Sequence, residues 1–435
     1  RSVFNDFRRD LNFGLRRQTN PNIPWAWTAM SRDRLLEAAR RTIAHAKAET
    51  VPLAETIGKV PVEHYLDHDR WLNEVRSLFH RFPLVFGFSC EFVERYSYRS
   101  TEVIGIPVLV TRAADDELRA FVNTCSHRGA QVVPEGTGTS RRFTCPYHAW
   151  SYYNFGQLVG ILDHDEFGQL EMSCHGLTEL PVLECAGLVF VGLDHEGTDD
   201  LERYLCGYGE MLEHLGLAGC YFAGQQIVDG PNWKIAYDGY LDFYHLPILH
   251  RKSFGADLCN KAIYDAWGPH QRVSAPDASA LRLDQSPESQ WSIGALTSGI
   301  WTIFPHVSIA SFHVAGPNGE GGGRMYMVSQ LFPGETPDAS TTTQTFLTTF
   351  EPTEEMLPFI EAQQRFLLRV VRDEDYATGF LLQRGLKSGA KDFVMFGRNE
   401  AGGQRFHEWV DRLVHTESES EVLALVDKAT YEPQR

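Results

Sequence analysis

The sequence is poor in cysteine, in clustered positive charge and in long apolar runs, and each shortage excludes a class of protein. Eight cysteines among 435 residues are too few for a scaffold held by disulfides. Forty basic side chains stand against 57 acidic ones, and the formal net charge of −17 argues against binding to nucleic acid phosphates. No apolar stretch approaches the roughly 20 residues of a membrane span. The charged, polar start is unlike a signal peptide, so we expect a cytoplasmic protein.

Composition is that of a globular protein, with 43% apolar and 22% charged residues, and the length is typical of two or three domains. The spacing of apolar residues predicts a helical extension over residues 1–58, in which Ser31 caps the main helix. A helical lead-in is predicted over residues 59–91, with a helix that begins at Asp67 or Asp69.

The pattern then changes to short strands. Runs of strand-forming residues separated by Gly, Pro and Asp predict a small antiparallel β domain over residues 92–199. Residues 200–435 mix longer strand runs with a helical block and form the second predicted domain. The Ser-, Pro- and Asp-rich stretch 272–290 has little periodicity and is predicted to be a loop.

Four potential metal ligands fall on two short segments of the predicted β domain. Cys125 and His127 form a C-x-H pair, and Cys145 and His148 form a C-x-x-H pair after 17 intervening residues. Three interpretations compete: a structural zinc site, a chance grouping of core residues, and a Rieske [2Fe–2S] cluster with two thiolates on one iron and two imidazoles on the other. Zinc is disfavoured because common zinc modules use C-x-x-C and H-x-x-x-H pairs.

The segments CSHRGA and CPYHAW resemble the cluster loops of Rieske proteins. The resemblance implies a [2Fe–2S] cluster held by Cys125, His127, Cys145 and His148.

High-potential Rieske proteins differ from this chain at the same loops. They carry two further cysteines where this chain has Ala130 and Tyr147, and cluster-bonding hydroxyls where it has Ala149 and Trp150. Because fewer hydrogen bonds to sulfur stabilise the reduced cluster less, we expect a lower potential and a cluster that donates electrons to an oxygen-activating site.

A second constellation lies in the C-terminal region, where Asp242, His245 and His250 follow one another. Asp242 and His245 would share one face of a helix, whereas His245 and His250 would face different sides of an undistorted one. Pro247 marks a position where a kink could bring both imidazoles onto one ion. Two histidines and a carboxylate suit non-haem Fe(II) and O₂, although such a spacing is also common among structural or solvent-facing residues.

Together with the cluster loops, Asn232-Trp233-Lys234 followed by D-x-Y-H-x-x-x-x-H resembles the catalytic domain of Rieske non-haem iron oxygenases, the α component of ring-hydroxylating systems. The resemblance covers roughly residues 59–435. It implies an α+β fold, in which a small antiparallel β Rieske domain is inserted in or precedes a larger helix-grip-like domain whose antiparallel sheet is flanked by helices. It also implies mononuclear Fe(II) bound by His245 and His250, and a link through Asp242 from an iron-binding histidine to the cluster histidine of a neighbouring subunit.

The third iron ligand is expected from the C-terminal helical block. Glu374-Asp375, followed by Gln383-Arg384-Gly385-Leu386, resembles the ED…QRGL segment of the family and implies Asp375 as the ligand. Asp373 and Glu374 are alternatives, and such a charged run is also typical of a solvated helix start.

The resemblance implies a terminal oxygenase that uses O₂ and electrons from a reductase or ferredoxin to hydroxylate, cis-dihydroxylate or oxidatively dealkylate an apolar, aromatic substrate, as in aromatic hydrocarbon catabolism. It implies a homotrimer, or an α3β3 assembly with a small subunit. A Rieske electron carrier without oxygenase chemistry is the alternative, but it would not need the C-terminal 200 residues. The family usually has Glu-Asn where this chain has Asp238-Gly239. Candidates for an apolar pocket are Trp301, Phe304, Phe312, Met325 and Met327.

Overall fold

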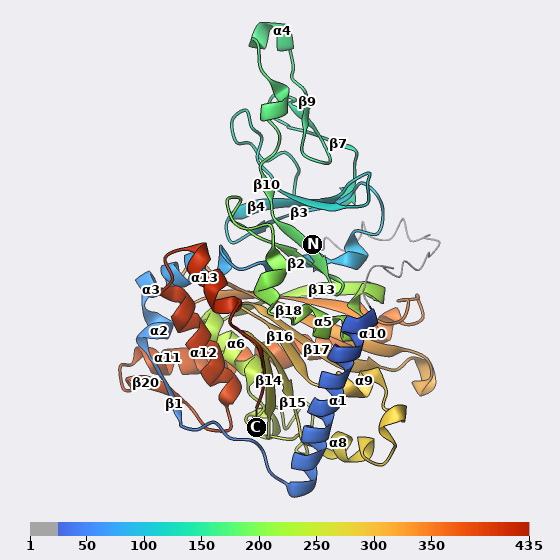
Figure 1. The fold of residues 1–435 in the computed structure, drawn as a ribbon, viewed down its shortest axis with the longest axis vertical. Helices are drawn as coiled ribbons and strands as arrows, with labels where there is room; N and C mark the ends of the chain where they lie inside the picture. Colours follow the sequence, from blue (N-terminus) through green and yellow to red (C-terminus); the bar gives the residue numbers. More distant parts are fainter. Residues whose placement is uncertain (1–24, 435) are drawn as a thin grey trace.

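The computed structural model describes residues 25–434, in which a small β domain stands on a larger α+β domain (Figure 1). Both domains are built on antiparallel sheets, and helices are concentrated in the larger one. The predicted fold class, a small antiparallel β domain with a larger domain of sheet and flanking helices, is confirmed.

Two sheets form most of the small domain. A five-stranded sheet has the order β10-β5-β4-β3-β6 and a three-stranded sheet the order β7-β8-β9. The strands are β3 (Ser97–Val103), β4 (Ile106–Arg112), β5 (Leu118–Val122), β6 (Gly136–Thr139), β7 (Arg142–Thr144), β8 (Ser151–Tyr153), β9 (Leu158–Gly160) and β10 (Glu179–Leu180). At the tip furthest from the larger domain lies helix α4 (His164–Phe167), followed by the 3₁₀ turn η4 (Met172–Cys174) (Figure 1).

A third sheet joins the two domains. It has the order β11 (Val182–Cys185), β12 (Leu188–Val191) and β2 (Leu84–Phe88). Strand β2 lies inside the predicted helical lead-in 59–91, which also contains β1 (Gly58–Pro61), α2 (Glu63–Leu66), α3 (His68–Glu74) and the π-helical turn η2 (Val75–Phe79). As predicted, Asp67 begins a helix, because its side chain accepts a hydrogen bond from the backbone N–H of Arg70 at the start of α3.

The larger domain is built on an eight-stranded antiparallel sheet of order β13-β19-β18-β17-β16-β15-β14-β21. Its strands are β13 (Tyr221–Gly230), β14 (Ile263–Trp267), β15 (His270–Ser274), β16 (Ile300–Ile303), β17 (Val307–Val314), β18 (Gly323–Pro333), β19 (Ser340–Thr348) and β21 (Tyr431–Pro433). β20 (Phe393–Phe396) pairs with β1 outside this sheet.

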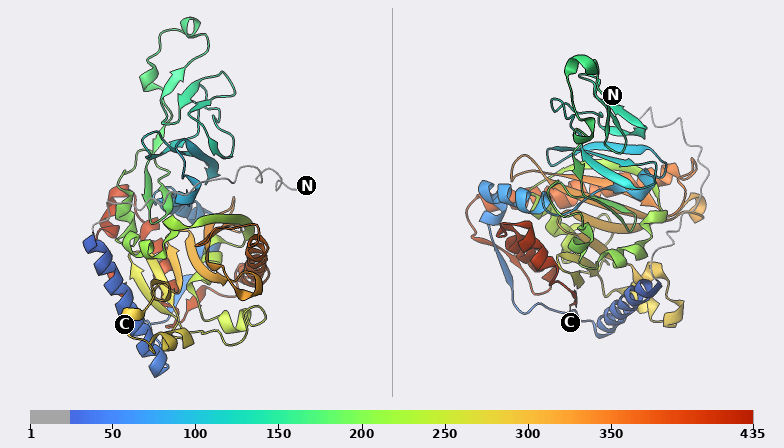
Figure 2. Two further views of the ribbon diagram at one scale, coloured as in Figure 1. Left: turned by 90° about the vertical axis from the view of Figure 1, so that its right-hand side faces the viewer. Right: turned by 45° about the horizontal axis from the view of Figure 1, so that its top comes forward.

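Helices cover both faces of the large sheet, which lies between α1 and α10 in the left view of Figure 2. One face packs against α6 (Trp233–Leu241) and α10 (Leu357–Val370), which continues through the π-helical turn η10 (Val371–Tyr376) into α11 (Ala377–Lys387). The opposite face packs against α1 (Trp25–Ala48) and its neighbours. The other helices are α5 (Gly209–Leu212), α7 (Leu246–Leu249), α8 (Ala278–Leu283), α9 (Ile293–Leu296), α12 (Ala401–Val414) and α13 (Glu419–Val426). The remaining 3₁₀ turns are η3 (Ser89–Glu91), η5 (Leu201–Leu205), η6 (Glu213–Leu215), η7 (Leu217–Gly219), η8 (Glu288–Gln290) and η9 (Pro317–Gly319).

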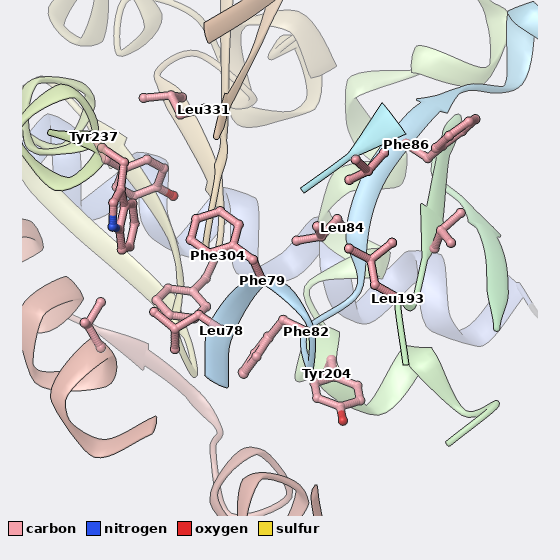
Figure 3. Packing of buried hydrophobic residues seen from close by; sticks show 14 of the residues in the cluster. Leu78, Phe79, Phe82, Leu84, Phe86, Leu193, Tyr204, Tyr237, Phe304 and Leu331 are labelled. Carbon is pink, nitrogen blue, oxygen red and sulfur yellow. The ribbon is translucent and has the colours of Figure 1, made fainter. Parts of the chain in front are cut away.

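The main apolar core runs from the joining sheet into the larger domain. Phe82 makes edge-on contacts with Tyr204 and Phe304, and Phe79 makes one with Trp233 at the start of α6 (Figure 3). These rings are almost fully buried. The core therefore fixes α6, which leads to the predicted iron ligands, against the segment that carries the small domain.

Three expectations about local structure are wrong. Ser31 does not cap a helix, because α1 begins at Trp25 and Ser31 is buried within it, with its hydroxyl 2.8 Å from His214 Nε2. The stretch 272–290 is not a loop throughout, since it starts in β15 and contains α8, which Asp277 caps. Trp301 faces α1 across the sheet, because strand alternation places it opposite the α10 face.

The extension packs on its own chain in the part that the structure describes. Helix α1 lies against α5, α8 and α9, and Arg40 donates two hydrogen bonds of 2.6 and 2.7 Å to Glu288. Residues 1–24 of the predicted extension lie outside the described residues. Among the helices of residues 25–434, none combines the length and the apolar character needed to cross a membrane.

Candidate functional site

The two cysteine–histidine segments form matching loops. In each loop the cysteine N–H donates to the carbonyl oxygen five residues later, and its own carbonyl accepts from the N–H four residues later. That fourth residue has left-handed backbone dihedrals in both loops, with φ of 78° at Gly129 and 57° at Ala149. Glycine adopts this conformation without strain, whereas alanine does so rarely.

The loops bring the four predicted cluster ligands together. Cys125 and Cys145 are buried and unlinked, and burial raises the pKa of the Cys125 thiol, which lies against Cys145. The rings of His127 and His148 lie 4.6 Å apart between centroids. Trp150 stacks on His127 at 4.9 Å and an interplanar angle of 9°.

These residues fit a Rieske cluster. The Nδ1 atom of His127 is buried and lacks a hydrogen-bond partner within the described residues, as expected of a nitrogen that binds iron. Two thiols beside two half-buried imidazoles provide the sulfur and nitrogen donors that such a cluster uses.

A tyrosine hydroxyl supplements this site. Tyr152 Oη lies 3.2 Å from Cys125 Sγ and accepts a 3.0 Å hydrogen bond from the backbone N–H of Ser126. Ala149 and Trp150 predict fewer hydrogen bonds to sulfur, but that prediction leaves out Tyr152, which reaches from the second loop to the first. The spacing C-P-Y-H-A-W-S-Y could have signalled it.

The second constellation, Asp242, His245 and His250, lies just beyond the C-terminal end of α6. This helix ends at Leu241, and Asp242 is extended, so Asp242 and His245 do not share a helix as expected. His245 and His250 instead flank the one-turn helix α7, in which Pro247 stands in the first turn. The two rings nevertheless lie side by side, with centroids 5.1 Å apart, across a turn that is helical through Pro247.

The third member comes from the π-helical turn η10. Asp375 Oδ1 lies 3.2 Å from His250 Nε2 and 3.7 Å from His245 Nε2. The three potential ligand atoms all lie within 4.8 Å of one another. Such a set of two imidazole nitrogens and a carboxylate oxygen fits a mononuclear non-haem iron.

Each histidine is oriented by a second carboxylate. His245 Nδ1 lies 2.8 Å from Asp242 Oδ2, and His250 Nδ1 lies 2.7 Å from Glu374 Oε2. Burial lowers the pKa of His250, but the carboxylates of Asp375 and Glu374 outweigh burial, so its pKa is raised. With Nδ1 engaged in both rings, each Nε2 is left to face Asp375.

Sequence motifs around the site hold its elements together. The side chain of Asn232 caps α6, and its backbone N–H donates a 2.6 Å hydrogen bond to Gln383 Oε1 of α11. Lys234 forms a buried ion pair with Glu74, which also accepts a hydrogen bond from Trp233 Nε1. Because α6 leads to Asp242 and η10 leads into α11, the contact between Asn232 and Gln383 fixes the two sources of the predicted iron ligands relative to each other.

Comparison with known families covers both sites. The Rieske [2Fe-2S] domain family matches residues 84–175, and the ring hydroxylating alpha subunit (catalytic domain) family matches residues 224–416. The chain belongs to the Rieske non-haem iron oxygenases. It is accordingly an oxidoreductase of a family that carries a [2Fe–2S] cluster and mononuclear iron, uses O₂ and takes electrons from a reductase or ferredoxin.

Relatives of this Rieske oxygenase include subunits of several oxygenases. It is 28% identical over 341 residues to the carnitine monooxygenase oxygenase subunit of Acinetobacter baumannii, covering 75% of this chain and 85% of the relative. The anthranilate 1,2-dioxygenase large subunit of Acinetobacter baylyi is 34% identical over 158 residues, which cover 33% of this chain and 32% of the relative.

Solved structures share the fold. A quaternary ammonium Rieske monooxygenase superposes with a TM-score of 0.68 at 22% identity, covering 82% of this chain and 96% of that one. Naphthalene 1,2-dioxygenase from Rhodococcus sp. gives a TM-score of 0.68 at 21% identity, covering 88% and 98%.

The Rieske oxygenase differs from the family pattern next to the iron site. Asp238 faces away from the triad, where it accepts a 3.0 Å hydrogen bond from Tyr65 and lies 2.9 Å from His407 Nε2. A Cβ atom added at Gly239 would meet nothing within 4 Å. The substitution of glycine for the usual asparagine therefore leaves open space beside α6.

Proposed function

We propose that this Rieske oxygenase binds its mononuclear iron through His245, His250 and Asp375, and its cluster through Cys125, His127, Cys145 and His148. The observation that supports this most directly is the convergence of the two imidazole Nε2 atoms on one carboxylate oxygen, with both Nδ1 atoms held by other carboxylates. Iron held there supplies O₂ activation, with electrons delivered from the cluster.

The chain's own side chains position these groups. Asp242 and Glu374 keep each imidazole in the tautomer that presents Nε2 to a metal. Phe254 lies edge-on to His250, with ring centroids 5.9 Å apart, and in turn contacts Phe366 of α10. Phe254 is itself 40% exposed, so the two rings add apolar surface on one side of His250 without closing the site to water.

We infer that electrons cross between subunits of a head-to-tail trimer through Asp242. The two sites lie in different domains of one chain (Figure 1). Apolar side chains are exposed at both of them: Ile248, between His245 and His250, is 79% exposed, and Tyr147, on the second cluster loop, is 60% exposed. Contact between these surfaces in neighbouring copies would cover both and bring a cluster histidine to Asp242.

An Asp242→Asn variant tests this route. It keeps a hydrogen-bonding group of the same size but loses the charge that would bind histidines on both sides. In protein reloaded with iron, so that a weaker His245 ligand is compensated, we expect both metal centres to be present and substrate-coupled turnover to be nearly abolished. Asp257→Asn, at an exposed aspartate further along the same segment, should retain turnover. Near-normal turnover of Asp242→Asn would refute the bridging role.

For the substrate, we propose a small polar organic compound. The relatives are named for carnitine, glycine betaine, anthranilate and 2-aminobenzenesulfonate, and each of these molecules bears a carboxylate or a sulfonate group. The aromatic character expected from the sequence remains a prediction, because two of these compounds are quaternary ammonium compounds.

Metal analysis and single turnover test the oxygenase function. A cluster and a mononuclear site together require three irons and two sulfides per chain. The anaerobically purified, reduced protein should consume one of the four named compounds when O₂ is admitted, with O₂ uptake matching product. Two irons per chain would leave only an electron carrier, and zinc in place of iron would contradict both sites.

A further inference from the structure

A line of polar side chains crosses the face of the large sheet that packs against α6 and α10. Strand pairing places these residues opposite one another in consecutive strands β16, β17, β18, β19 and β13. Directly paired residues project on the same face of a sheet. The line consists of Thr302, Ser308, Ser329, Gln344 and Gln226.

The middle of this line has unpaired polar groups. Ser308, Ser329 and Gln344 are at most 1% exposed, yet Ser308 Oγ, Ser329 Oγ and Gln344 Nε2 have no hydrogen-bond partner within the described residues. The two ends of the line are satisfied: Thr302 Oγ1 donates to a backbone carbonyl, and Gln226 Nε2 donates to Gln344 Oε1 at 2.7 Å. Buried polar groups normally have partners, so three adjacent exceptions mark a place that receives a polar ligand.

The same place adjoins the iron site. The hydroxyl of Tyr240, on α6, is also buried; it lies close enough to Ser329, Gln344 and Tyr376 to interact with them, but none of these contacts within the described residues has full hydrogen-bond geometry. Burial raises the pKa of Tyr240 to about 12, and the nearby Asp375 carboxylate adds to this shift, so the hydroxyl keeps its proton. Tyr376, which follows Asp375, is hydrogen-bonded at 2.5 Å to Thr342, two residues before Gln344 on β19.

These four groups select for a hydrogen-bond acceptor. Gln344 Oε1 is engaged by Gln226, so only the donor end of its amide is free. The hydroxyls of Ser308, Ser329 and Tyr240 can also donate, and these side chains are all uncharged.

An apolar row adjoins the polar one. Two residues along the same strands and on the same face, Ala310, Met327 and Phe346 are paired with one another and buried. The sheet face under α6 and α10 is therefore amphipathic, with hydrogen-bond donors next to hydrocarbon.

We propose that Ser308, Ser329, Gln344 and Tyr240 bind an acceptor oxygen of the substrate, as found in a carbonyl, carboxylate or sulfonate group. This inference rests on the oxygenase function proposed above and deepens it. The oxygen-bearing end of the substrate would lie on the polar line, while its hydrocarbon part lies over the apolar row. The four residues would thus determine which carbon faces the iron ligands.

Binding of matched probes to the iron-loaded protein tests the proposal. Benzoate, benzamide and toluene share one ring, and only the first two carry an acceptor oxygen. By isothermal titration under anaerobic conditions, we expect benzoate or benzamide to bind at least about tenfold more tightly than toluene. Ser329→Ala and Gln344→Leu should each weaken that binding about tenfold and leave toluene unaffected.

A matched control separates this effect from general loss of a buried hydroxyl. Ser97 Oγ is also buried and unpaired, but it lies on β3 of the small domain, so Ser97→Ala should not change binding of any probe. Equal affinity for the three probes, no binding of the oxygen-bearing pair, or unchanged binding in Ser329→Ala and Gln344→Leu would overturn the proposal. A crystal structure with bound benzoate in which all four side chains are hydrogen-bonded to ordered waters instead of to benzoate would also overturn the proposal.

The two proposals fail in different ways. Selective binding without O₂ uptake coupled to product would defeat the oxygenase function and leave the binding site in place. Coupled turnover by a protein that does not distinguish benzoate or benzamide from toluene would defeat the binding site alone.

Discussion

Glu374 Oε2 lies 2.7 Å from His250 Nδ1, on the side of the imidazole ring that faces away from Asp375. Ser253 donates a 2.5 Å hydrogen bond to the other oxygen of Glu374 and so fixes the carboxylate. Two adjacent acidic residues of one helical segment thereby contact opposite nitrogens of the same histidine. Both residues belong to the π-helical turn η10, a type of turn that is frequent at functional sites.

Replacement of Glu374 by glutamine should weaken the retention of mononuclear iron. The amide can still contact His250, but it lacks the charge that makes the imidazole a stronger ligand. Loss of such an outer partner typically costs 10- to 100-fold in metal affinity. The measurement is the iron content after dialysis against graded chelator concentrations, with cluster absorbance recorded in parallel. Asp373→Asn is the matched control, because this neighbouring carboxylate is exposed and pairs with Arg372. Equal iron retention in Glu374→Gln and the wild type would show that the Glu374 carboxylate does not strengthen iron binding by His250.

Removal of the Asp375 carboxylate should separate the two metal centres. Asp375→Ala leaves two imidazoles at the mononuclear site and does not touch the cluster loops. We expect the variant to lose one iron per chain, to keep two irons and two sulfides, and to lose substrate-coupled turnover. Metal and sulfide analysis measures this directly. If the variant kept all three irons, another carboxylate would have to be the ligand, and Glu374 would be the first candidate.

Loss of the Tyr152 hydroxyl should lower the cluster potential. The hydroxyl lies 3.2 Å from Cys125 Sγ, and a hydrogen bond to a cluster sulfur stabilises the reduced state. We expect Tyr152→Phe to assemble the cluster with a more negative midpoint potential in a redox titration followed by electron paramagnetic resonance. Tyr153→Phe controls for the loss of a tyrosine hydroxyl, because Tyr153 is partly exposed and stacks on Phe155 instead. An unchanged midpoint in Tyr152→Phe would exclude this contribution.

The proposed cluster ligands could be picked out from the sequence because their spacing is local. Cys125 and His127, like Cys145 and His148, each share one short loop, so the donor pairs are visible in the sequence. Asp375 lies 125 residues beyond His250, and only the resemblance of its segment to a known family predicts it. The structure brings it within 3.2 Å of His250.

Features that depend on packing could not be predicted in the same way. The roles of Glu374 and Tyr152 rest on contacts across 124 and 27 residues, to which no periodicity points. Its apolar character makes Trp301 a candidate pocket residue, but the strand alternation that turns it toward α1 depends on where β16 begins. Ser31 has the chemistry of a helix cap, yet the helix already begins at Trp25.

Two buried histidines should make the larger domain sensitive to mild acid. His270 Nδ1 and His306 Nε2 each accept a 3.1 Å hydrogen bond from a backbone N–H, of Phe304 and Val85 respectively. Protonation of either ring nitrogen would place its new N–H group against the backbone N–H from which it now accepts a hydrogen bond. In addition, burial disfavours the charged imidazolium. It lowers the pKa of His270 to about 4 and that of His306 to about 3, well below the value near 6.5 in the unfolded chain.

The direction in which the free energy of unfolding changes with pH follows from proton uptake by the unfolded chain. Below pH 6.5 the unfolded chain binds protons that the folded one does not, so the free energy of unfolding falls as pH falls. Each histidine contributes about 1.4 kcal/mol per pH unit between pH 6.5 and about 4. His270→Gln retains an acceptor for Phe304 N–H and cannot titrate. In urea unfolding between pH 7 and 5, above the range where most carboxylates protonate, the free energy of unfolding of His270→Gln should fall less steeply than that of the wild type. The difference should be about 1.4 kcal/mol per pH unit. His164→Gln, at a histidine on the tip of the small domain, should decline like the wild type. The same slope in His270→Gln and the wild type would show that the buried ring accepts a proton without opening the fold.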